Sequence, residues 1–399
     1  MSSVYLVKVE PNANNNKYYR MIQNGDRFEV QYGRIGVSGC QTTSYPMSKW
    51  ESTIKSKIKK GYVDQTRLVA EPTVKRKKDY ADIPNSIIQS IVSRLQSMAR
   101  KAIEDNYTIT ANKVTNTMIS EAQSQLHNLM NVDSVDMFNK ILVELFKTIP
   151  RKMRSVKEHL ARSTSDFAKI IQSEQDLLDV MKGQVAHESE TNNVNGNNDT
   201  LNTSQTILEA MGLIFEETTF EDREVIKSQM GSIKDKFYQA WKVTNIKTQE
   251  KFDNFVKVNN IKDRRLLFHG SRNENFWSII NTSLVLRPSA QITGKMFGYG
   301  IYFAPKAQKS LGYTSLHGSY WAGGNANSGF MGLFDVAYGK SYDVHSFDSK
   351  YYDFNYDKLQ QASKGSNCIH AHAGNMLKND EIIVYKEDQL TIKYLIEIK

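Results

Sequence analysis

Three patches in the last third of the chain contain the residues whose types and spacing are best suited to chemistry. They cover 266–272, 294–304 and 379–385, and each places a polar group at the end of an apolar run typical of a strand. A site of this kind holds its ligand on a rigid sheet. The polar residues are His269, Tyr302 and Glu381.

The middle patch, 294–304, is rich enough in glycine to approach a phosphate closely. Its glycines are not in the order G-x-G-x-x-G, however, and a strand-like run follows them where a helix would be needed. A doubly wound dinucleotide fold is therefore not expected. Taken singly, His269, Tyr302, Tyr313 and Glu381 each have an ordinary structural explanation, as a bonded histidine, two core aromatics and a solvated strand residue. It is their combination that favours a site.

The composition predicts a multidomain globular protein. The 399 residues exceed one ordinary core, and 40% are hydrophobic. Of the net charge of +9, most lies in residues 1–80, where 15 Lys and Arg stand against 7 Asp and Glu. A basic module of this kind suggests contact with a polyanion, because neutralising phosphates releases counterions. A basic surface that serves only solubility is the alternative.

No run of about 18 apolar residues and no secretory pattern occurs, so we expect neither a membrane partner nor secretion. Cys40 and Cys368 lie too far apart for a disulfide framework or for the clustered ligands of a zinc site. We expect two free thiols and no metal.

The first domain, predicted over 1–74, is a small antiparallel β module with a helix. Strands are predicted over 4–9, 18–22 and 27–33, with turn residues between the last two. A helix is predicted over 47–60, with Trp50, Ile54 and Ile58 on one face. A basic linker, 75–82, follows, which is either a nuclear-import patch or a solvated hinge.

A second domain, an all-α helical bundle, is predicted over 83–185. Apolar stripes run along 87–95 and along 135–149, where Pro150 ends the helix, and Ser173 with Asp176 resembles a capping box. The Asn-rich stretch 186–204 is predicted to be a linker or loop. The third domain, 205–399, is predicted to be α+β, with one or two helices over 215–256 and a final strand over 390–398.

Together, the three patches resemble the ordered motifs of the DNA-dependent poly(ADP-ribose) polymerases, in particular the shorter members without zinc fingers. Residues 269–272 resemble the opening motif, 300–304 the central one and 379–385 the closing one. The resemblance covers nearly the whole chain. It implies an ADP-ribosyltransferase domain with a split antiparallel sheet, NAD+ as substrate, and a catalytic triad of His269, Tyr302 and Glu381.

The resemblance also implies roles for these residues. His269 would bind the adenosine ribose, and Glu381 would stabilise the oxocarbenium-like sugar and orient the acceptor. Gly270 and Ser310 would hold the nicotinamide amide, while Tyr302 and Tyr313 would sandwich its ring. Lys309 would assist near the pyrophosphate or the acceptor. The remaining residues predicted to bind NAD+ are Ser271, Arg287 and Gly300.

The N-terminal module resembles the WGR domain, with Tyr32 in place of the tryptophan that gives the domain its name, followed by Gly33 and Arg34. The resemblance implies binding to DNA ends through Tyr32, Arg34 and Lys49, with the arginine bridging to the helical domain. A tyrosine can still stack on a base. A basic β module that binds protein is the alternative.

The helical bundle resembles the family's regulatory domain, which covers the NAD+ pocket until DNA binding loosens it; a plain packing domain is the alternative. We therefore predict a poly-ADP-ribosyltransferase that is activated by DNA strand breaks and modifies proteins, itself included. It would be nuclear in a eukaryote and otherwise cytoplasmic. A mono-ADP-ribosyltransferase and a catalytically silent DNA-end scaffold are the other functions considered.

Overall fold

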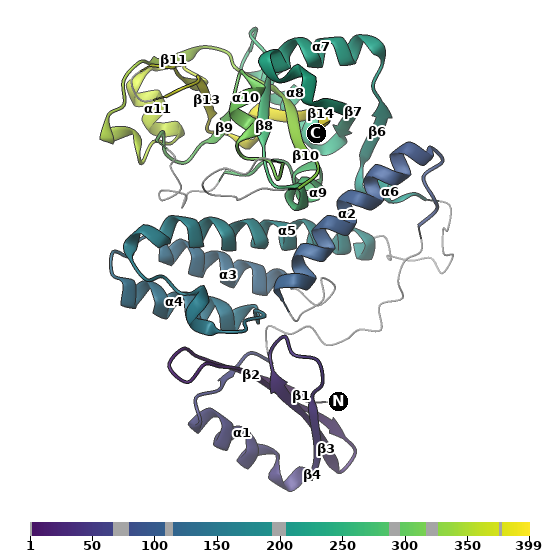
Figure 1. The fold of residues 1–399 in the computed structure, drawn as a ribbon, viewed down its shortest axis with the longest axis vertical. Coiled ribbons are helices and arrows are strands. Elements are labelled where there is room, and N and C mark those ends of the chain that lie inside the picture. Colours follow the sequence, from purple (N-terminus) through teal and green to yellow (C-terminus); the bar gives the residue numbers. More distant parts are fainter. Residues whose placement is uncertain are drawn as a thin grey trace. The chain divides into compact units, whose positions relative to one another are not determined.

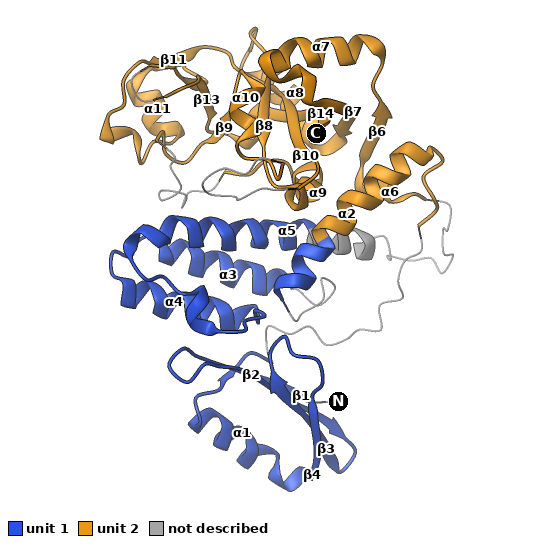
Figure 2. Ribbon diagram, in the orientation of Figure 1, with its two compact units in different colours: residues 1–77, 100–185 blue, residues 78–99, 186–399 orange. Residues whose placement is uncertain are grey.

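The computed structural model describes residues 2–66, 80–107, 115–193, 205–286, 296–316, 326–374 and 377–399. The chain forms two compact units, shown in Figure 2: a first unit of residues 1–77 with 100–185, and a second of residues 78–99 with 186–399. Helix α2 (Ser86–Asn106) is shared between them. Arg287, most of the predicted basic linker and residues 194–204 lie outside the described residues.

The N-terminal part of the first unit is a five-stranded antiparallel sheet in the order β4-β3-β2-β1-β5 (Figure 1). The strands are β1 (Ser3–Glu10), β2 (Asn15–Asn24), β3 (Arg27–Arg34), β4 (Gln41–Pro46) and β5 (Val63–Asp64). The three predicted strands are confirmed, while β4 and β5 were not predicted.

Helix α1 (Trp50–Lys59), preceded by a 3-10 turn (Met47–Lys49), packs Trp50 and Ile54 on this sheet's core. The predicted apolar face is narrower than expected, since Ile58 is 43% exposed. The sheet core is closed mainly by alternating strand residues such as Leu6, Met21 and Phe28.

The rest of the first unit is helical. It contains α3 (Asn116–Leu129), α4 (Val135–Thr148) and α5 (Phe167–Asn193) together with the end of α2. The stripe predicted over 135–149 is confirmed, because Phe138, Leu142 and Leu145 are buried and α4 ends just before Pro150.

The predicted helix start at Ser173 is wrong. Ser173 lies inside α5, and the capping box lies ten residues earlier, where Ser163 and Asp166 bond each other's backbone ahead of Phe167. The sequence offers two similar Ser-x-x-Asp spacings, and the helical hydrogen bonds follow the first. The predicted loop at 186–204 is also wrong for 186–193, which continue α5.

The second unit is built on two sheets, with strand orders β6-β7-β14-β10-β8 and β11-β12-β13-β9. Their pairs are antiparallel except β11 with β12. The strands are β6 (Leu213–Glu217), β7 (Phe237–Asn245), β8 (Arg265–Gly270), β9 (Ile301–Phe303), β10 (Gly329–Val336), β11 (Ser341–Val344), β12 (Cys368–Ala371), β13 (Glu381–Val384) and β14 (Leu390–Ile398). The predicted multidomain α+β class with a split antiparallel sheet is confirmed.

Helices cover these sheets (Figure 1). They are α6 (Ile207–Met211), α7 (Phe220–Met230), α8 (Ile246–Val258), α9 (Phe276–Thr282), α10 (Ala307–Leu311) and α11 (Tyr356–Ala362). The stretch 215–256 holds α7 and α8 as predicted, but also most of β6 and all of β7, which were not. The β-branched and aromatic side chains of β7 are what favour a strand there.

The final strand, β14, lies between β7 and β10, and eight of its nine residues are buried, so both of its faces are covered. The first part of α2 belongs to the same unit: Arg94 pairs with the buried Glu397 of β14 at 2.7 Å and lies over the Phe330 ring.

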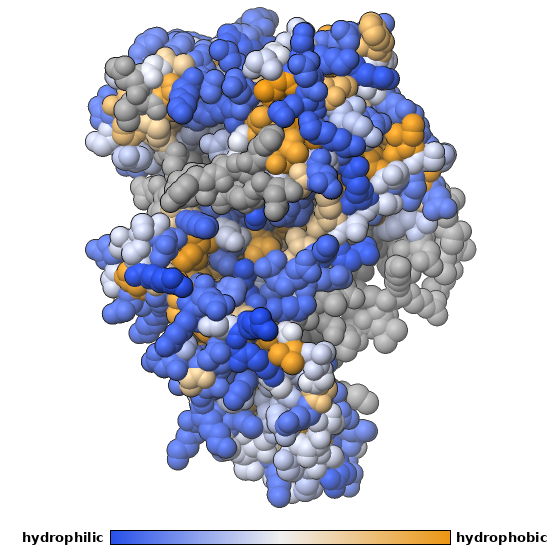
Figure 3. Space-filling view, in the orientation of Figure 1, coloured by the Kyte–Doolittle hydropathy of each residue, from blue (hydrophilic) through white to orange (hydrophobic). Residues whose placement is uncertain are grey.

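Hydrophilic side chains predominate on the face drawn in Figure 3, and hydrophobic ones form small groups. Among the described residues, no helix has the length and apolar character needed to cross a membrane. Cys40 and Cys368 are free thiols, the first exposed and the second buried.

Candidate active site

The two sheets of the second unit meet where β8 approaches β9. Phe268 and Ala304 exchange backbone hydrogen bonds of 2.9 Å in both directions. Strand β9 in turn pairs with β13, with Tyr302 opposite Ile383 and Phe303 opposite Ile382. Three neighbouring strands therefore carry His269, Tyr302 and Glu381, although these residues are far apart in the sequence.

The imidazole of His269 is held in one orientation. Its Nδ1 lies 3.1 Å from the backbone oxygen of Tyr302, and its ring stands edge-on to Phe303 and Phe334. A carbonyl oxygen only accepts, so Nδ1 carries the proton of this bond. The tautomer is thereby set by the strand that carries Tyr302.

The hydroxyl of Tyr302 is fixed by two hydrogen bonds. Its hydroxyl accepts from the Phe297 backbone N–H at 2.9 Å and donates to the Gly298 carbonyl at 3.1 Å. Burial, with the negative charge of Glu381 adding to it, raises the pKa of Tyr302 well above its ordinary value. The phenol therefore stays neutral and offers a rigid ring.

Glu381 is the first residue of β13 and forms an ion pair with Lys309 of α10. Both side chains are largely shielded from water, with 12% of the glutamate and 17% of the lysine exposed. A shielded pair of this kind interacts more strongly than a surface pair, because water screens it less. The lysine thus holds the carboxylate in place at the end of its strand.

Tyr313 lies close enough to Glu381 for the negative charge of the carboxylate to affect its phenol. Partial burial raises the pKa of Tyr313, and the carboxylate adds to the effect. Tyr313 is 44% exposed, so it is not a core residue. An exposed ring beside a catalytic-type carboxylate is available to stack on a flat ligand.

Glycines allow close backbone approach in two of the three motifs. A Cβ on Gly270 would overlap the carbonyl oxygen of the buried Ser310 and lie 2.9 Å from its carbonyl carbon. A Cβ on Gly300 would overlap Ile383 of β13. A side chain at Gly270 would displace α10, and one at Gly300 would displace β13, so packing requires both glycines.

Among the predicted site residues, the structure brings together His269, Gly270, Tyr302, Lys309, Ser310, Tyr313 and Glu381, and Gly300 lies against β13 beside them. Ser271 accepts a hydrogen bond from the Asn275 amide at 3.0 Å, while Arg287 lies outside the described residues. Sequence reasoning missed Tyr385, whose hydroxyl donates to the Phe297 carbonyl at 2.7 Å and so steadies the loop that holds Tyr302. Its place in the closing patch was the available signal.

The three residues predicted to bind DNA have different surroundings in the first unit. Tyr32 lies at the end of β3 with its ring 5.7 Å from that of Tyr19, and Lys57 lies over the Tyr19 ring. Lys49 is exposed. Arg34 instead donates to the carbonyls of Asn14, Met153 and Arg154, at 2.7, 3.1 and 2.8 Å. Its guanidinium therefore joins the N-terminal module to the segment after α4.

This segment, 151–154, is also anchored in the helical bundle. The Arg151 carbonyl accepts from the buried Asn16 amide at 2.9 Å, while the Arg151 side chain pairs with Glu174 of α5 at 2.9 Å. Both side chains are 7% exposed, and Tyr107 accepts a further bond from the guanidinium. The segment thus connects the module's backbone contacts to a buried ion pair of the bundle.

In the comparison with known proteins, one family model matches each end of the chain. The family model described as the poly(ADP-ribose) polymerase catalytic domain matches residues 221–399, and the WGR domain model matches residues 2–68. The poly(ADP-ribose) polymerase-like protein 100L of Invertebrate iridescent virus 6 is 35% identical over 187 residues, 46% of this chain and 96% of that protein.

Two longer relatives match as well. Poly(ADP-ribose) polymerase 2 of Arabidopsis thaliana is 30% identical over 174 residues, which are 37% of this chain and 26% of the plant protein. A protein mono-ADP-ribosyltransferase of Mus musculus is 23% identical over 397 residues, 92% of this chain and 19% of the mouse protein.

Proposed function

This chain belongs to the poly(ADP-ribose) polymerase family and is an NAD+ ADP-ribosyltransferase, and on that premise we propose that it builds ADP-ribose polymers on proteins, itself included, in response to DNA strand breaks. The observation that carries the proposal is the convergence of His269, Tyr302 and Glu381 on three neighbouring strands. Because β8, β9 and β13 are neighbours, one site would contain an imidazole, a fixed phenol and a carboxylate.

The transfer reaction breaks the bond between the nicotinamide nitrogen and C1′ of the ribose. The electron pair of that bond leaves with nicotinamide, the sugar becomes oxocarbenium-like, and an acceptor oxygen bonds to C1′ and loses its proton. The Glu381 carboxylate would stabilise the positive sugar and orient the acceptor. Lys309, now paired with Glu381, would lie near the pyrophosphate or the acceptor.

The other site residues would bind NAD+ without taking part in bond breaking. Gly270 lies against the backbone of Ser310, and the Gly270 backbone and the Ser310 hydroxyl would together hold the nicotinamide amide. Tyr302 and Tyr313 would enclose its ring, and His269 would bind the adenosine ribose. Ser271, Arg287 and Gly300 would make further contacts to NAD+.

Polymer extension is favoured by the presence of Glu381, because an acceptor that is itself a ribose must be oriented as well as attacked. Single-unit transfer is the second candidate, and the name of the mouse relative favours it. Incubation of the full chain with labelled NAD+ followed by gel analysis separates the two. A ladder of products supports polymer extension, and one discrete band supports single-unit transfer.

DNA sensing is proposed for the N-terminal module, which carries most of the chain's net positive charge. Arg34 and Asn16 connect this module to the segment 151–154 and, through Arg151, to the bundle. DNA bound by the module would favour a loosened bundle, and NAD+ would bind that state better. We therefore expect a nuclear protein in a eukaryotic cell and a cytoplasmic one otherwise.

The test is nicotinamide release by the full chain with and without a nicked duplex. DNA-dependent release supports transferase activity that responds to DNA, while the gel analysis decides between polymer extension and single-unit transfer. Release that is unaffected by DNA would support the transferase activity and contradict its activation by DNA. No release under either condition would favour a catalytically silent scaffold.

Replacing Tyr32 with alanine is expected to weaken binding to nicked DNA by about 1 to 3 kcal/mol, the usual contribution of one stacked aromatic ring. DNA stimulation of nicotinamide release should fall with it, whereas basal release should be unchanged, because Tyr32 lies in the first unit. Fluorescence anisotropy with labelled duplex measures the affinity. Tyr238→Ala, which removes an exposed ring of the second unit, is the control. Equal losses in both variants would contradict a stacking role for Tyr32.

A further inference from the structure

Four titratable side chains share one face of the sheet formed by β11 and β12. The two strands are parallel, with Asp343 opposite His370, and the His372 N–H continues the ladder to the Val344 carbonyl at 2.8 Å. Because strand side chains alternate between faces, His345 and His372 follow on the same side two residues later. The opposite side is apolar and belongs to the core of this unit, where its members include Val344, Ile369 and Ala371.

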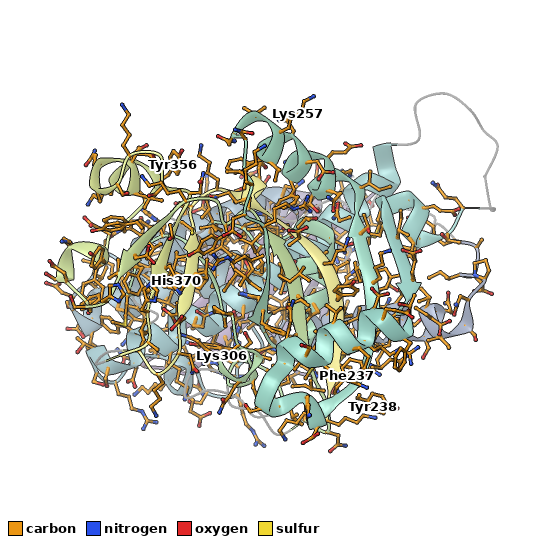
Figure 4. All side chains as sticks on the ribbon, turned by 90° about the horizontal axis from the view of Figure 1, so that it is seen from above. Phe237, Tyr238, Lys257, Lys306, Tyr356 and His370 are labelled. Atoms are coloured by element: carbon orange, nitrogen blue, oxygen red, sulfur yellow. The ribbon has the colours of Figure 1, made fainter. Side chains whose placement is uncertain are left out.

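The side chains of this face are in contact with one another. The His370 and His372 rings stack with centroids 3.9 Å apart, and His345 stacks on His372 at 4.3 Å. Asp343 Oδ1 lies 2.7 Å from His372 Nε2 and 3.9 Å from His370 Nδ1. One ligand atom each from Asp343, His370 and His372 lies within 4.8 Å of the other two. His370 is labelled in Figure 4.

A carboxylate behind the cluster orients His370. Its Nε2 lies 3.0 Å from Asp380 Oδ2, and the other Asp380 oxygen accepts from the Ala373 N–H at 2.8 Å. The proton of His370 therefore lies on Nε2, which leaves the lone pair of Nδ1 facing Asp343 and the Tyr338 hydroxyl, 2.9 Å away. An imidazole that donates to a carboxylate through its far nitrogen is the usual state of a metal-ligating histidine.

We propose that Asp343, His370 and His372 bind a divalent cation of the zinc type, with His345 beside them as a further imidazole. Two imidazoles and one carboxylate favour zinc over calcium or magnesium, which prefer oxygen ligands alone. Ligands at zinc distances lie about 3.3 Å apart. The present separations from Asp343, 2.7 Å to His372 and 3.9 Å to His370, lie on either side of that value. The cation would replace the Tyr338 hydroxyl as the partner of Nδ1.

The proposed site is separate from the transferase residues, and its role is structural. The cation would fasten β11 to β12 and, through His370, fix Asp380. Asp380 directly precedes Glu381, the first residue of β13, so the start of that strand would be steadied as well. The reaction itself needs none of these side chains.

The test is zinc binding by the full chain, purified with its affinity tag removed and treated with a chelator. Calorimetric titration with Zn²⁺ should show one site per chain, and the double variant Asp343→Asn/His372→Gln should lose at least about 100-fold in affinity. Asp380→Asn should lose about 10- to 100-fold, as expected for a supporting carboxylate. His127→Gln, which removes an exposed histidine of α3, is the control and should bind as the unaltered chain does.

Circular dichroism checks that each variant is folded. Should the double variant fail to fold, His372→Gln alone carries the same expectation, since this side chain is 28% exposed. Absence of saturable zinc binding by the unaltered chain would overturn the proposal. So would equal affinity in the folded cluster variant and the control.

Discussion

Replacing Glu381 with glutamine is expected to lower nicotinamide release by about 100- to 1,000-fold, the usual effect of removing one group that stabilises charge in a transition state. Glutamine keeps the size of the side chain and removes its negative charge. Positive charge develops on the ribose only as the bond to nicotinamide breaks, so NAD+ binding should change little. Polymer length should fall further, because the same carboxylate would orient the acceptor.

Nicotinamide release, NAD+ affinity by calorimetry and gel analysis of the products measure the three effects of Glu381→Gln. Glu250→Gln, an exposed glutamate of α8 in the same unit, is the matched control. The loss of the Lys309 ion pair is a second consequence, which Lys309→Met tests separately. A variant at Glu381 that loses NAD+ binding and turnover in equal proportion would rule out the proposed role.

Replacing Glu174 with alanine is expected to destabilise the helical bundle by about 3 to 5 kcal/mol, because the buried guanidinium of Arg151 would lose its charge partner. Burial raises the pKa of Glu174, and the positive charge of Arg151 opposes that rise. Burying the charged Glu174 carboxylate is unfavourable, and its ion pair with Arg151 offsets that cost. The same arginine connects the bundle to the N-terminal module through its backbone carbonyl.

Hydrogen exchange followed by mass spectrometry measures this loss over peptides from α3 and α4, which should exchange faster. Peptides from β10 and β14 of the second unit serve as an internal reference. Glu158→Ala, an exposed glutamate of the same unit, should change exchange by less than about 0.5 kcal/mol. A loss below about 1 kcal/mol at Glu174 would mean that water reaches the Arg151 guanidinium.

Much of the local structure could be predicted from the sequence, because it depends on neighbouring residues. Strand-like runs and turn residues predicted β1, β2 and β3, and the apolar spacing predicted α4 with its end before Pro150. Prediction failed where several local patterns compete. The helix start was predicted at Ser173, although Ser163 fits the same spacing. Strand β7 was not predicted, because it lies in the sequence between the two predicted helices.

The cluster of Asp343, His370 and His372 shows that local sequence patterns also fail to predict a site whose residues come from different strands. Sequence reasoning searched for a metal site through the cysteines, whereas these residues come from two strands separated by more than twenty residues. The spacing His-Ala-His at 370–372 was visible, but its partner Asp343 could be found only from the parallel register.

By itself, the sequence determined which side chains are available: a histidine, a tyrosine and a glutamate in three ordered motifs, glycines beside them, and a basic first domain. Tertiary structure decided which of them meet. The bridge between Phe268 and Ala304 joins the two sheets, Lys309 reaches Glu381 from a helix, and Arg34 is directed to the carbonyls of 153 and 154. Contacts between distant segments depend on strand order and register, which packing of the whole core sets and no local pattern encodes.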